Sequence, residues 1–241
     1  MQLIIDIGNT RAKTAVFNGC EIISKRIFKK VSYEIIKPLI TKYKVDTIIF
    51  SSVSSNILNE KSFRQNKILL MELTAQTKIP VKNKYTTPAT LGKDRLANAV
   101  GTAFINPNKN NLVIDAGTCL KFDFVNAKNE YMGGAISPGL QMRYKALNYF
   151  TDKLPEISAS KKLPALVGNS TQNAIRSGVQ QGMLAEIIGV IDAYKKRYKN
   201  LHVYLTGGDA SYFEPQLKKA IFAPDLTLYG LNEILRFNTK K

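Results

Sequence analysis

The chain has 241 residues, which suffices for one large or two small domains, and its apolar content is ample for a buried core. A formal net charge of +17 is compatible with nucleic-acid binding or with attraction of an anionic substrate such as ATP. Because the lysines are scattered between apolar residues, as on solvated faces, we favour the anionic substrate and expect no nucleic-acid partner.

Other classes of protein are also excluded by composition. No apolar run approaches the length of a membrane span, and the N-terminus opens on a strand pattern rather than a secretory signal, so we expect a cytoplasmic location. Cys20 and Cys119 are too few for a disulfide framework or a thiolate metal site. His202 is the single histidine and lies in a strand pattern, which argues against Ser-His-Asp chemistry and histidine metal sites.

The first predicted element is a β-hairpin at the N-terminus. The apolar residues 3–5 run into Asp6, Gly8 and Thr10, and a second apolar run begins at Thr14. The run has the length of a buried strand, and Asp with Gly is a hairpin-turn signal. Glycine lets a ligand approach the backbone, while the carboxylate and hydroxyl suit a cation and phosphate oxygens. For a single copy, an ordinary hairpin with a polar tip is an equal alternative.

The remainder of the first half alternates strands and helices. A third strand is predicted over residues 21–28, and Pro38 interrupts a helical pattern over residues 33–43. Further strands are expected at residues 47–53 and 68–73. A loop over residues 85–95 opens a helix at residues 96–104, and the turn formers at residues 106–111 form the clearest linker.

The second half repeats this plan. Residues 112–118 again run from apolar residues through Asp115 and Gly117 to Thr118, and a second apolar run follows. We expect a glycine-rich turn at residues 133–139, then helices at 140–150 and 171–198, a strand from residue 203 ending in Gly207-Gly208, and a last helix at 231–237. Two copies favour two related α/β lobes, residues 1–108 and 109–241, with half-sites facing a shared cleft.

Four groups of residues carry candidate chemistry. The turn from Asp6 to Lys13 offers donors to phosphate but lacks the ending of a P-loop, and Asp6 is well placed to reach Mg²⁺. Asp115 with Thr118 is the equivalent turn of the second lobe. Gly207-Gly208 would admit a flat ring against the backbone. The fourth is the run at residues 92–95, where an Asp and an Arg open a helix as a cap or as a catalytic pair.

Six segments in order carry a family resemblance: residues 6–10, 91–95, 115–118, 133–139, 171–178 and 206–209. Together they resemble the type III pantothenate kinases of the acetate and sugar kinase, Hsp70 and actin superfamily. The resemblance implies two ribonuclease-H-like lobes with the nucleotide in the cleft between them. It also implies ATP-dependent phosphorylation of pantothenate to 4'-phosphopantothenate, the first step of coenzyme A biosynthesis, by a homodimer that uses Mg²⁺ and a monovalent cation, K⁺ or NH₄⁺.

Individual residues acquire roles through this resemblance. Asp94 would be the proton acceptor, Thr118 a second ATP contact, and Asp115 the ligand of the monovalent cation. The ATP phosphate loop would comprise Asp6, Ile7, Gly8, Asn9, Thr10, Arg11, Ala12 and Lys13. Pantothenate would contact Tyr85, Gly92, Lys93, Asp94, Arg95 and Thr171. Arg95 suits the substrate carboxylate because its planar guanidinium binds bidentately.

The sequence departs from the family pattern at two positions. Lys93 stands where the family usually has Ala, and it either points outward or alters the substrate pocket. Lys121 stands where a Thr usually follows the second turn. Ser170 is a rival to Thr171 as the substrate contact. Two other functions remain open: another small-molecule kinase of the same fold, and a non-catalytic regulatory relative that binds DNA.

Overall fold

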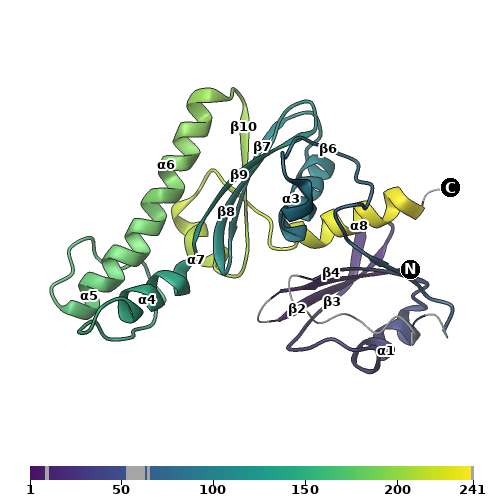
Figure 1. Cartoon of the computed structure of the whole chain (residues 1–241), viewed down its shortest axis with the longest axis horizontal. Coiled ribbons are helices and arrows are strands. Elements are labelled where there is room, and N and C mark those ends of the chain that lie inside the picture. The colour runs from purple at the N-terminus through teal and green to yellow at the C-terminus, as the bar shows by residue number, and fades with distance from the viewer. Residues whose placement is uncertain (9–10, 53–62, 64–65, 240–241) are drawn as a thin grey trace. The chain divides into compact units, whose positions relative to one another are not determined.

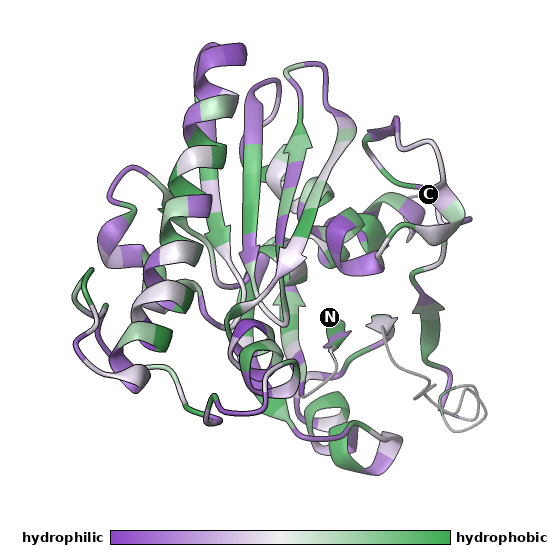
Figure 2. Cartoon of the chain, turned by 60° about the vertical axis from the view of Figure 1, so that its left-hand side comes forward, coloured by the Kyte–Doolittle hydropathy of each residue, from purple (hydrophilic) through white to green (hydrophobic). Residues whose placement is uncertain are grey.

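The computed structural model describes residues 1–8, 11–52, 63 and 66–239. These form two compact α/β units (Figure 1). The first unit comprises Met1–Pro107, Asn129–Tyr131 and Asp225–Lys241, and the second comprises Asn108–Lys128 and Met132–Pro224. In Figure 2, hydrophobic stretches run along the strands, and hydrophobic and hydrophilic residues alternate along the helices, as expected for elements that bury one face.

The first unit is built on a five-stranded sheet in the order β3-β2-β1-β4-β5. Its strands are β1 (Gln2–Ile7), β2 (Ala12–Asn18), β3 (Glu21–Phe28), β4 (Thr47–Ser52) and β5 (Leu69–Glu72). β1 runs antiparallel to β2 and parallel to β4. The alternate residues Leu3, Ile5 and Ile7 of β1 belong to one buried cluster with Ile36 and Ile40 of α1 (Tyr33–Tyr43). Successive strand residues point to opposite faces, so Asp6 faces away from α1.

Helices α3 (Lys93–Ile105) and α8 (Leu226–Thr239) pack against one another in the first unit, and α8 contacts β1, β2 and β4. Glycines permit this close packing. A Cβ on Gly230 would lie 1.8 Å from the Ala97 carbonyl oxygen, and one on Gly101 would lie 2.5 Å from the Leu226 carbonyl oxygen. The backbones therefore touch at this crossing, which fixes the helix that carries Asp94.

The second unit repeats the first. Its strands are β7 (Asn110–Ala116), β8 (Cys119–Val125), β9 (Glu130–Pro138), β10 (Leu201–Thr206) and β11 (Ile221–Phe222), in the order β11-β10-β7-β8-β9. β7 runs antiparallel to β8 and parallel to β10, as β1 does to β2 and β4. The short strand β6 (Lys82–Asn83) pairs with Glu130 and Tyr131 at the beginning of β9. The duplicated α/β plan expected from the two hairpins is confirmed.

The helices of the second unit include both stretches predicted at residues 140–150 and 171–198, and a short helix at Ala210–Phe213 that was not predicted. They are α4 (Leu140–Tyr149), α5 (Thr171–Arg176), the π-helical segment η2 (Ser177–Gln181), α6 (Gly182–Arg197) and α7 (Ala210–Phe213). Two 3₁₀ turns, η1 (Pro88–Thr90) and η3 (Glu214–Gln216), complete the described elements. Met183, Ile187 and Ile191 of α6 pack into the core with strands β7, β8 and β10.

The structure differs from the sequence analysis at four places. The segment at residues 133–139 was expected as a turn, but it lies mainly in β9, because Gly134 lets this strand approach β8 so closely that a Cβ would meet the Phe122 carbonyl oxygen at 1.7 Å. Helix α3 begins at Lys93 rather than residue 96, and α8 begins at Leu226 rather than residue 231. Residues 225–241, expected in the C-terminal lobe, belong by their contacts to the first unit.

Candidate functional site

The N-terminal hairpin has the predicted form. β1 ends at Ile7 and β2 begins at Ala12, and the antiparallel register places Asp6 opposite Lys13. The Gly8 amide donates a hydrogen bond to the Arg11 carbonyl oxygen at 3.1 Å, which closes the connection. Asn9 and Thr10, two of the predicted phosphate contacts, lie outside the described residues.

Sequence reasoning missed a residue beside Asp6. The parallel register of β1 and β4 places Ser51 next to Asp6. Ser51 is fully buried, and its hydroxyl oxygen has no hydrogen-bond partner within the part of the chain that the structure describes. A carboxylate beside an unsatisfied hydroxyl forms an oxygen-rich position, and such oxygens suit a hard cation such as Mg²⁺. The only signal in the sequence was the Ser51-Ser52 ending of an apolar strand.

The second hairpin is tighter. Gly117 and Thr118 alone connect β7 to β8, and the Gly117 amide donates to the Cys119 carbonyl oxygen at 3.1 Å. Asp115 lies opposite Lys121 in the register, and the Lys121 Nζ is 2.8 Å from the Asp115 Oδ2. Their side chains are only 12% and 14% exposed, respectively. The carboxylate expected to bind a monovalent cation therefore already has an ammonium group against it.

A glycine turn closes over the same carboxylate. Gly207, directly after β10, has a φ of +103°, which favours glycine. A Cβ there would lie 2.3 Å from the Ala116 carbonyl oxygen and 2.6 Å from the Asp115 Oδ1. The Asp209 amide donates to the Ala116 carbonyl oxygen at 2.8 Å. The Gly207 turn thus lies directly on the end of β7, and any side chain at this position would push it away.

The start of α4 packs on the hairpin in the same manner. A Cβ on Gly139 would lie 2.3 Å from the Gly117 carbonyl oxygen and 2.4 Å from the Thr118 carbonyl oxygen. Gly117, Gly139 and Gly207 therefore bring three chain segments together at the carboxyl ends of β7 and β10, and we call this surface of bare backbone the glycine wall. It admits a flat ring or a phosphate group close to the main chain. Thr118 is exposed at its edge.

The N-terminus of α3 gathers most of the predicted substrate residues in the first unit. Gly92 caps the helix, and a Cβ there would lie 2.7 Å from the Asp94 Oδ1, so a side chain at this position would require the Asp94 carboxylate to move. The Arg95 amide donates to that same oxygen at 2.9 Å. Arg95 is 4% exposed, with its guanidinium 5.5 Å from the centre of the Tyr85 ring. Tyr85 in turn stacks on Tyr131 with 6.1 Å between ring centres.

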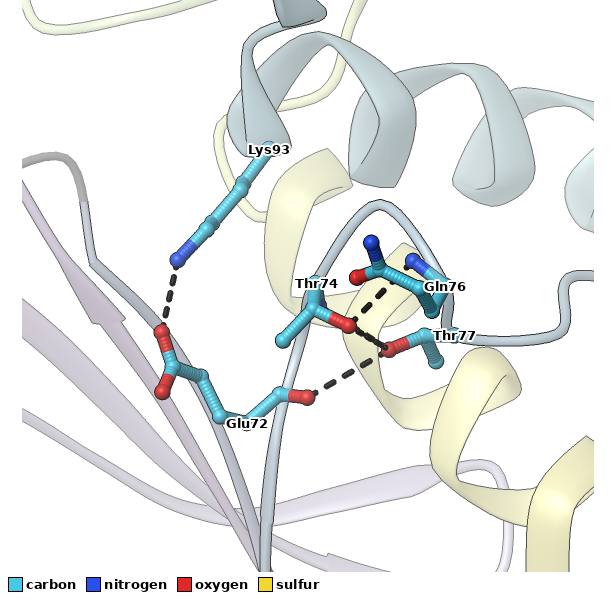
Figure 3. Close-up of polar contacts among 5 residues, drawn as sticks. All are labelled: Glu72, Thr74, Gln76, Thr77 and Lys93. Atoms are coloured by element: carbon cyan, nitrogen blue, oxygen red, sulfur yellow. Dashed lines mark hydrogen bonds and ion pairs between the residues drawn. The ribbon is translucent and has the colours of Figure 1, made fainter. Parts of the chain in front are cut away.

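Beside this helix start lies a cavity of about 310 Å³. It is lined by Thr74, Ala75, Thr77, Lys78, Ile79, Asn83, Tyr85, Pro88, Leu91, Lys93 and Leu96. Lys93 is therefore a lining residue, and its Nζ lies 2.7 Å from Glu72 Oε1 (Figure 3). Figure 3 also shows Thr74 and Thr77 hydrogen-bonded within the loop that follows β5. Glu72 and this loop were not identified from the sequence.

Thr171 and its rival Ser170 lie in the second unit. Ser170 is the N-cap of α5, and its hydroxyl oxygen accepts a hydrogen bond from the Asn173 amide at 3.3 Å. Thr171 is the first residue of the helix and is exposed. Ser170 therefore has a capping role in the helix, whereas Thr171 is an exposed residue of its first turn.

The cysteines, the histidine and the lengths of the helices can be compared with what the composition predicted. Cys20 and Cys119 are free thiols. His202 lies in strand β10, as the surrounding pattern predicted. Among the described residues, no helix has the length and apolar character to cross a membrane.

Comparison with known proteins identifies the family. The type III pantothenate kinase family model matches residues 2–193. A type III pantothenate kinase of Phocaeicola vulgatus is 45% identical, and the match covers 100% of both chains. One from Cytophaga hutchinsonii is 40% identical over 99% of this chain and 100% of its own.

Solved structures share the fold at low identity. A putative Baf family transcriptional activator from Campylobacter jejuni superposes with a TM-score of 0.62 at 22% identity, covering 98% of both chains. A putative N-acetylmannosamine kinase from Listeria monocytogenes gives a TM-score of 0.55 at 11% identity, covering 99% of both chains. These neighbours confirm the duplicated α/β fold. The full-length relatives and the family match together show that the chain belongs to the type III pantothenate kinase family.

Proposed function

We propose that this chain transfers the γ-phosphoryl group of ATP to the hydroxyl group of pantothenate, the first step of coenzyme A biosynthesis. The single observation that carries the proposal is the start of α3, where Asp94 is followed by the buried Arg95 and preceded by Lys93, which lines a cavity of about 310 Å³. A carboxylate, a guanidinium and a small cavity fit an acceptor that carries both a hydroxyl and a carboxylate. Family membership supports the same reaction.

On the acceptor side, Asp94 orients the hydroxyl group and takes its proton. Phosphoryl transfer passes through a loose transition state, so the base acts late and need not be strongly basic. Arg95 binds the carboxylate of pantothenate, and the Tyr85 ring holds the guanidinium in place. Gly92 and Lys93 border the substrate, and we assign Thr171 to a further substrate contact.

On the nucleotide side, we assign the turn from Asp6 to Lys13, including Asn9 and Thr10, to the phosphates of ATP. Its backbone amides and the Lys13 ammonium supply the positive field that phosphate oxygens require. In the second unit, Thr118 and the glycine wall at Gly139 and Gly207 are assigned to ATP because bare backbone admits a flat or anionic group.

Mg²⁺ fits the residues at the end of β1. Asp6 and the unsatisfied hydroxyl of Ser51 would hold it, directly or through water, since Mg²⁺ takes few protein carboxylates and keeps phosphate and water ligands. When bound, Mg²⁺ neutralises the charge of the ATP phosphates. A monovalent cation at Asp115, which the resemblance implies, does not fit equally well because Lys121 lies against that carboxylate at 2.8 Å.

We further propose that the chain acts as a homodimer in the cytoplasm. Among the described residues, the most exposed large apolar side chains are those of Tyr149, Phe150, Leu166 and Val167, each at least 76% exposed. They lie at the end of α4 and in the segment that precedes α5 in the second unit, and exposed apolar surface is a common site of association. Use of ATP and the two free thiols suit the cytoplasm. Light scattering coupled to size exclusion tests the dimer, and a monomer at working concentration contradicts it.

The proposed reaction is tested by ADP formation with Mg-ATP and a panel of acceptors: pantothenate, N-acetylmannosamine, N-acetylglucosamine and no acceptor. We expect turnover only with pantothenate. Turnover with a sugar instead would assign a different kinase to the same fold. Tight DNA binding with a steep salt dependence, without turnover on any acceptor, would favour a regulatory protein.

A further inference from the structure

We infer that the Lys121 ammonium is a built-in cation that replaces a monovalent metal ion at Asp115, so that phosphoryl transfer by this chain does not depend on K⁺ or NH₄⁺. The inference rests on the proposed function, because it concerns the cation that the pantothenate kinase resemblance implies. The ion pair between Lys121 and Asp115 is also present without substrate, so its effect on stability can be tested whatever the acceptor is.

The geometry of the pair carries the inference. Lys121 lies directly opposite Asp115 across the hairpin, so its side chain reaches the carboxylate without leaving the strand. The Nζ to Oδ2 distance of 2.8 Å is that of a charge-assisted hydrogen bond. The other oxygen, Oδ1, lies where a Cβ on Gly207 or Gly117 would come within 2.6 or 3.3 Å. The carboxylate is thus enclosed by glycine backbone on one side and by an ammonium group on the other.

Burial makes a counter-charge necessary. Asp115 is 8% exposed, and a carboxylate so far removed from water is costly unless a cation neutralises it. A potassium ion, an ammonium ion and the end of a lysine side chain each supply one positive charge. The lysine differs because it is tethered, so its occupancy does not fall when the salt concentration falls. A threonine at position 121 would offer no charge and would leave that role to an ion from solution.

The experiment measures turnover and thermal unfolding of the full chain in sodium, potassium, ammonium and choline chloride at equal ionic strength. The wild type is compared with Lys121→Thr. The matched control is Lys145→Thr, which removes an exposed lysine from α4 of the same unit and so changes the net charge equally.

We expect the wild-type turnover to be equal in all four salts. The turnover of Lys121→Thr in sodium or choline should be about tenfold or more below that of the wild type, because the buried carboxylate loses the Lys121 ammonium, and it should recover in potassium or ammonium. Without any substrate, potassium should raise the melting temperature of Lys121→Thr above its value in sodium. Neither the wild type nor Lys145→Thr should show this difference.

Wild-type turnover that requires potassium or ammonium overturns the inference. If Lys121→Thr does not fold, Lys121→Arg keeps the charge and should remain independent of potassium, and a potassium requirement in that folded variant also counts against the built-in cation. Absence of pantothenate-dependent turnover in every salt contradicts the proposed function instead. In that case, the melting temperatures still decide the inference, because a potassium response confined to Lys121→Thr supports it and its absence refutes it.

Discussion

The two hairpins of this chain share a sequence plan and a topology, yet their surroundings differ. Each pairs an Asp with a Lys across the antiparallel register and places a hydroxyl residue, Ser51 or Thr206, on the parallel neighbour. The first has a longer connection, from Gly8 to Arg11, and an unsatisfied buried hydroxyl beside its Asp. The second is closed by glycine backbone and an internal ion pair. The shared scaffold therefore places a buried serine hydroxyl beside Asp6 and glycine backbone against Asp115.

The largest effect should come from a residue outside both hairpins. Asp94→Asn keeps the size of the side chain and removes the proton acceptor, so turnover should fall by about two orders of magnitude or more. ATP affinity should hardly change, because ATP is assigned to the hairpins. Initial rates and nucleotide titration measure the two quantities separately. A fully active variant would show that Asp94 is not the base.

Asp6→Asn and Asp115→Asn sharpen the comparison between the carboxylates. We expect Asp6→Asn to raise the Mg²⁺ concentration needed for half-maximal turnover by about tenfold or more, since a proposed ligand is lost. Asp115→Asn should leave that concentration unchanged while lowering the free energy of unfolding, because the mostly buried Lys121 loses the Asp115 carboxylate. Magnesium titrations of both variants test this difference. An equal increase in the half-maximal Mg²⁺ concentration of the two variants would show that Asp6 is not the specific Mg²⁺ ligand.

The glycine wall predicts a difference between Gly207→Ala and Gly8→Ala. At Gly207 the φ of +103° and the 2.3 Å approach to the Ala116 carbonyl oxygen make a methyl group costly, by about 1–3 kcal/mol. At Gly8 the nearest atom to a Cβ is the Arg11 carbonyl oxygen at 3.3 Å, which a small shift relieves. Gly207→Ala should therefore have the lower melting temperature and the weaker ATP binding. A lower melting temperature and weaker ATP binding for Gly8→Ala would contradict the role assigned to Gly207.

The smallest effect on stability and activity is expected at the ion pair of Lys93 and Glu72, which is more exposed than the pair of Asp115 and Lys121 in the second hairpin. The two side chains are 29% and 34% exposed, so Glu72→Gln should change the free energy of unfolding by less than about 1 kcal/mol. Because Lys93 lines the cavity, Lys93→Ala should instead change the KM for pantothenate by a few-fold with kcat nearly constant. An unchanged KM would mean that Lys93 does not border the substrate.

Local patterns predicted much of this structure. Both hairpins, α1 and the helical stretch from Thr171 to Arg197 follow from apolar periodicity and turn residues within short windows. The glycines of residues 133–139 were misinterpreted as a turn because glycine also serves where strands approach closely, and the neighbouring β8 is not visible in a short window.

The missed parts of the candidate sites depend on distant residues. Ser51 is identified as a candidate site residue only because the strand register places it beside Asp6, and Glu72 only because it contacts Lys93. Residues 225–241 join the first unit through the crossing of Gly101 and Gly230, which local periodicity does not reveal. Lys121 was recognised as a departure from the family, but its pairing with Asp115 required the hairpin register.

The most direct test of the central claim is to follow the phosphoryl group itself. The full chain is incubated with Mg²⁺, pantothenate and ATP labelled with ¹⁸O in the γ-phosphate, and the products are analysed by mass spectrometry. A pantothenate kinase transfers the labelled group to pantothenate, so labelled 4'-phosphopantothenate should accumulate in step with ADP. Label recovered only in inorganic phosphate, or no consumption of ATP that the protein demonstrably binds, would contradict the account.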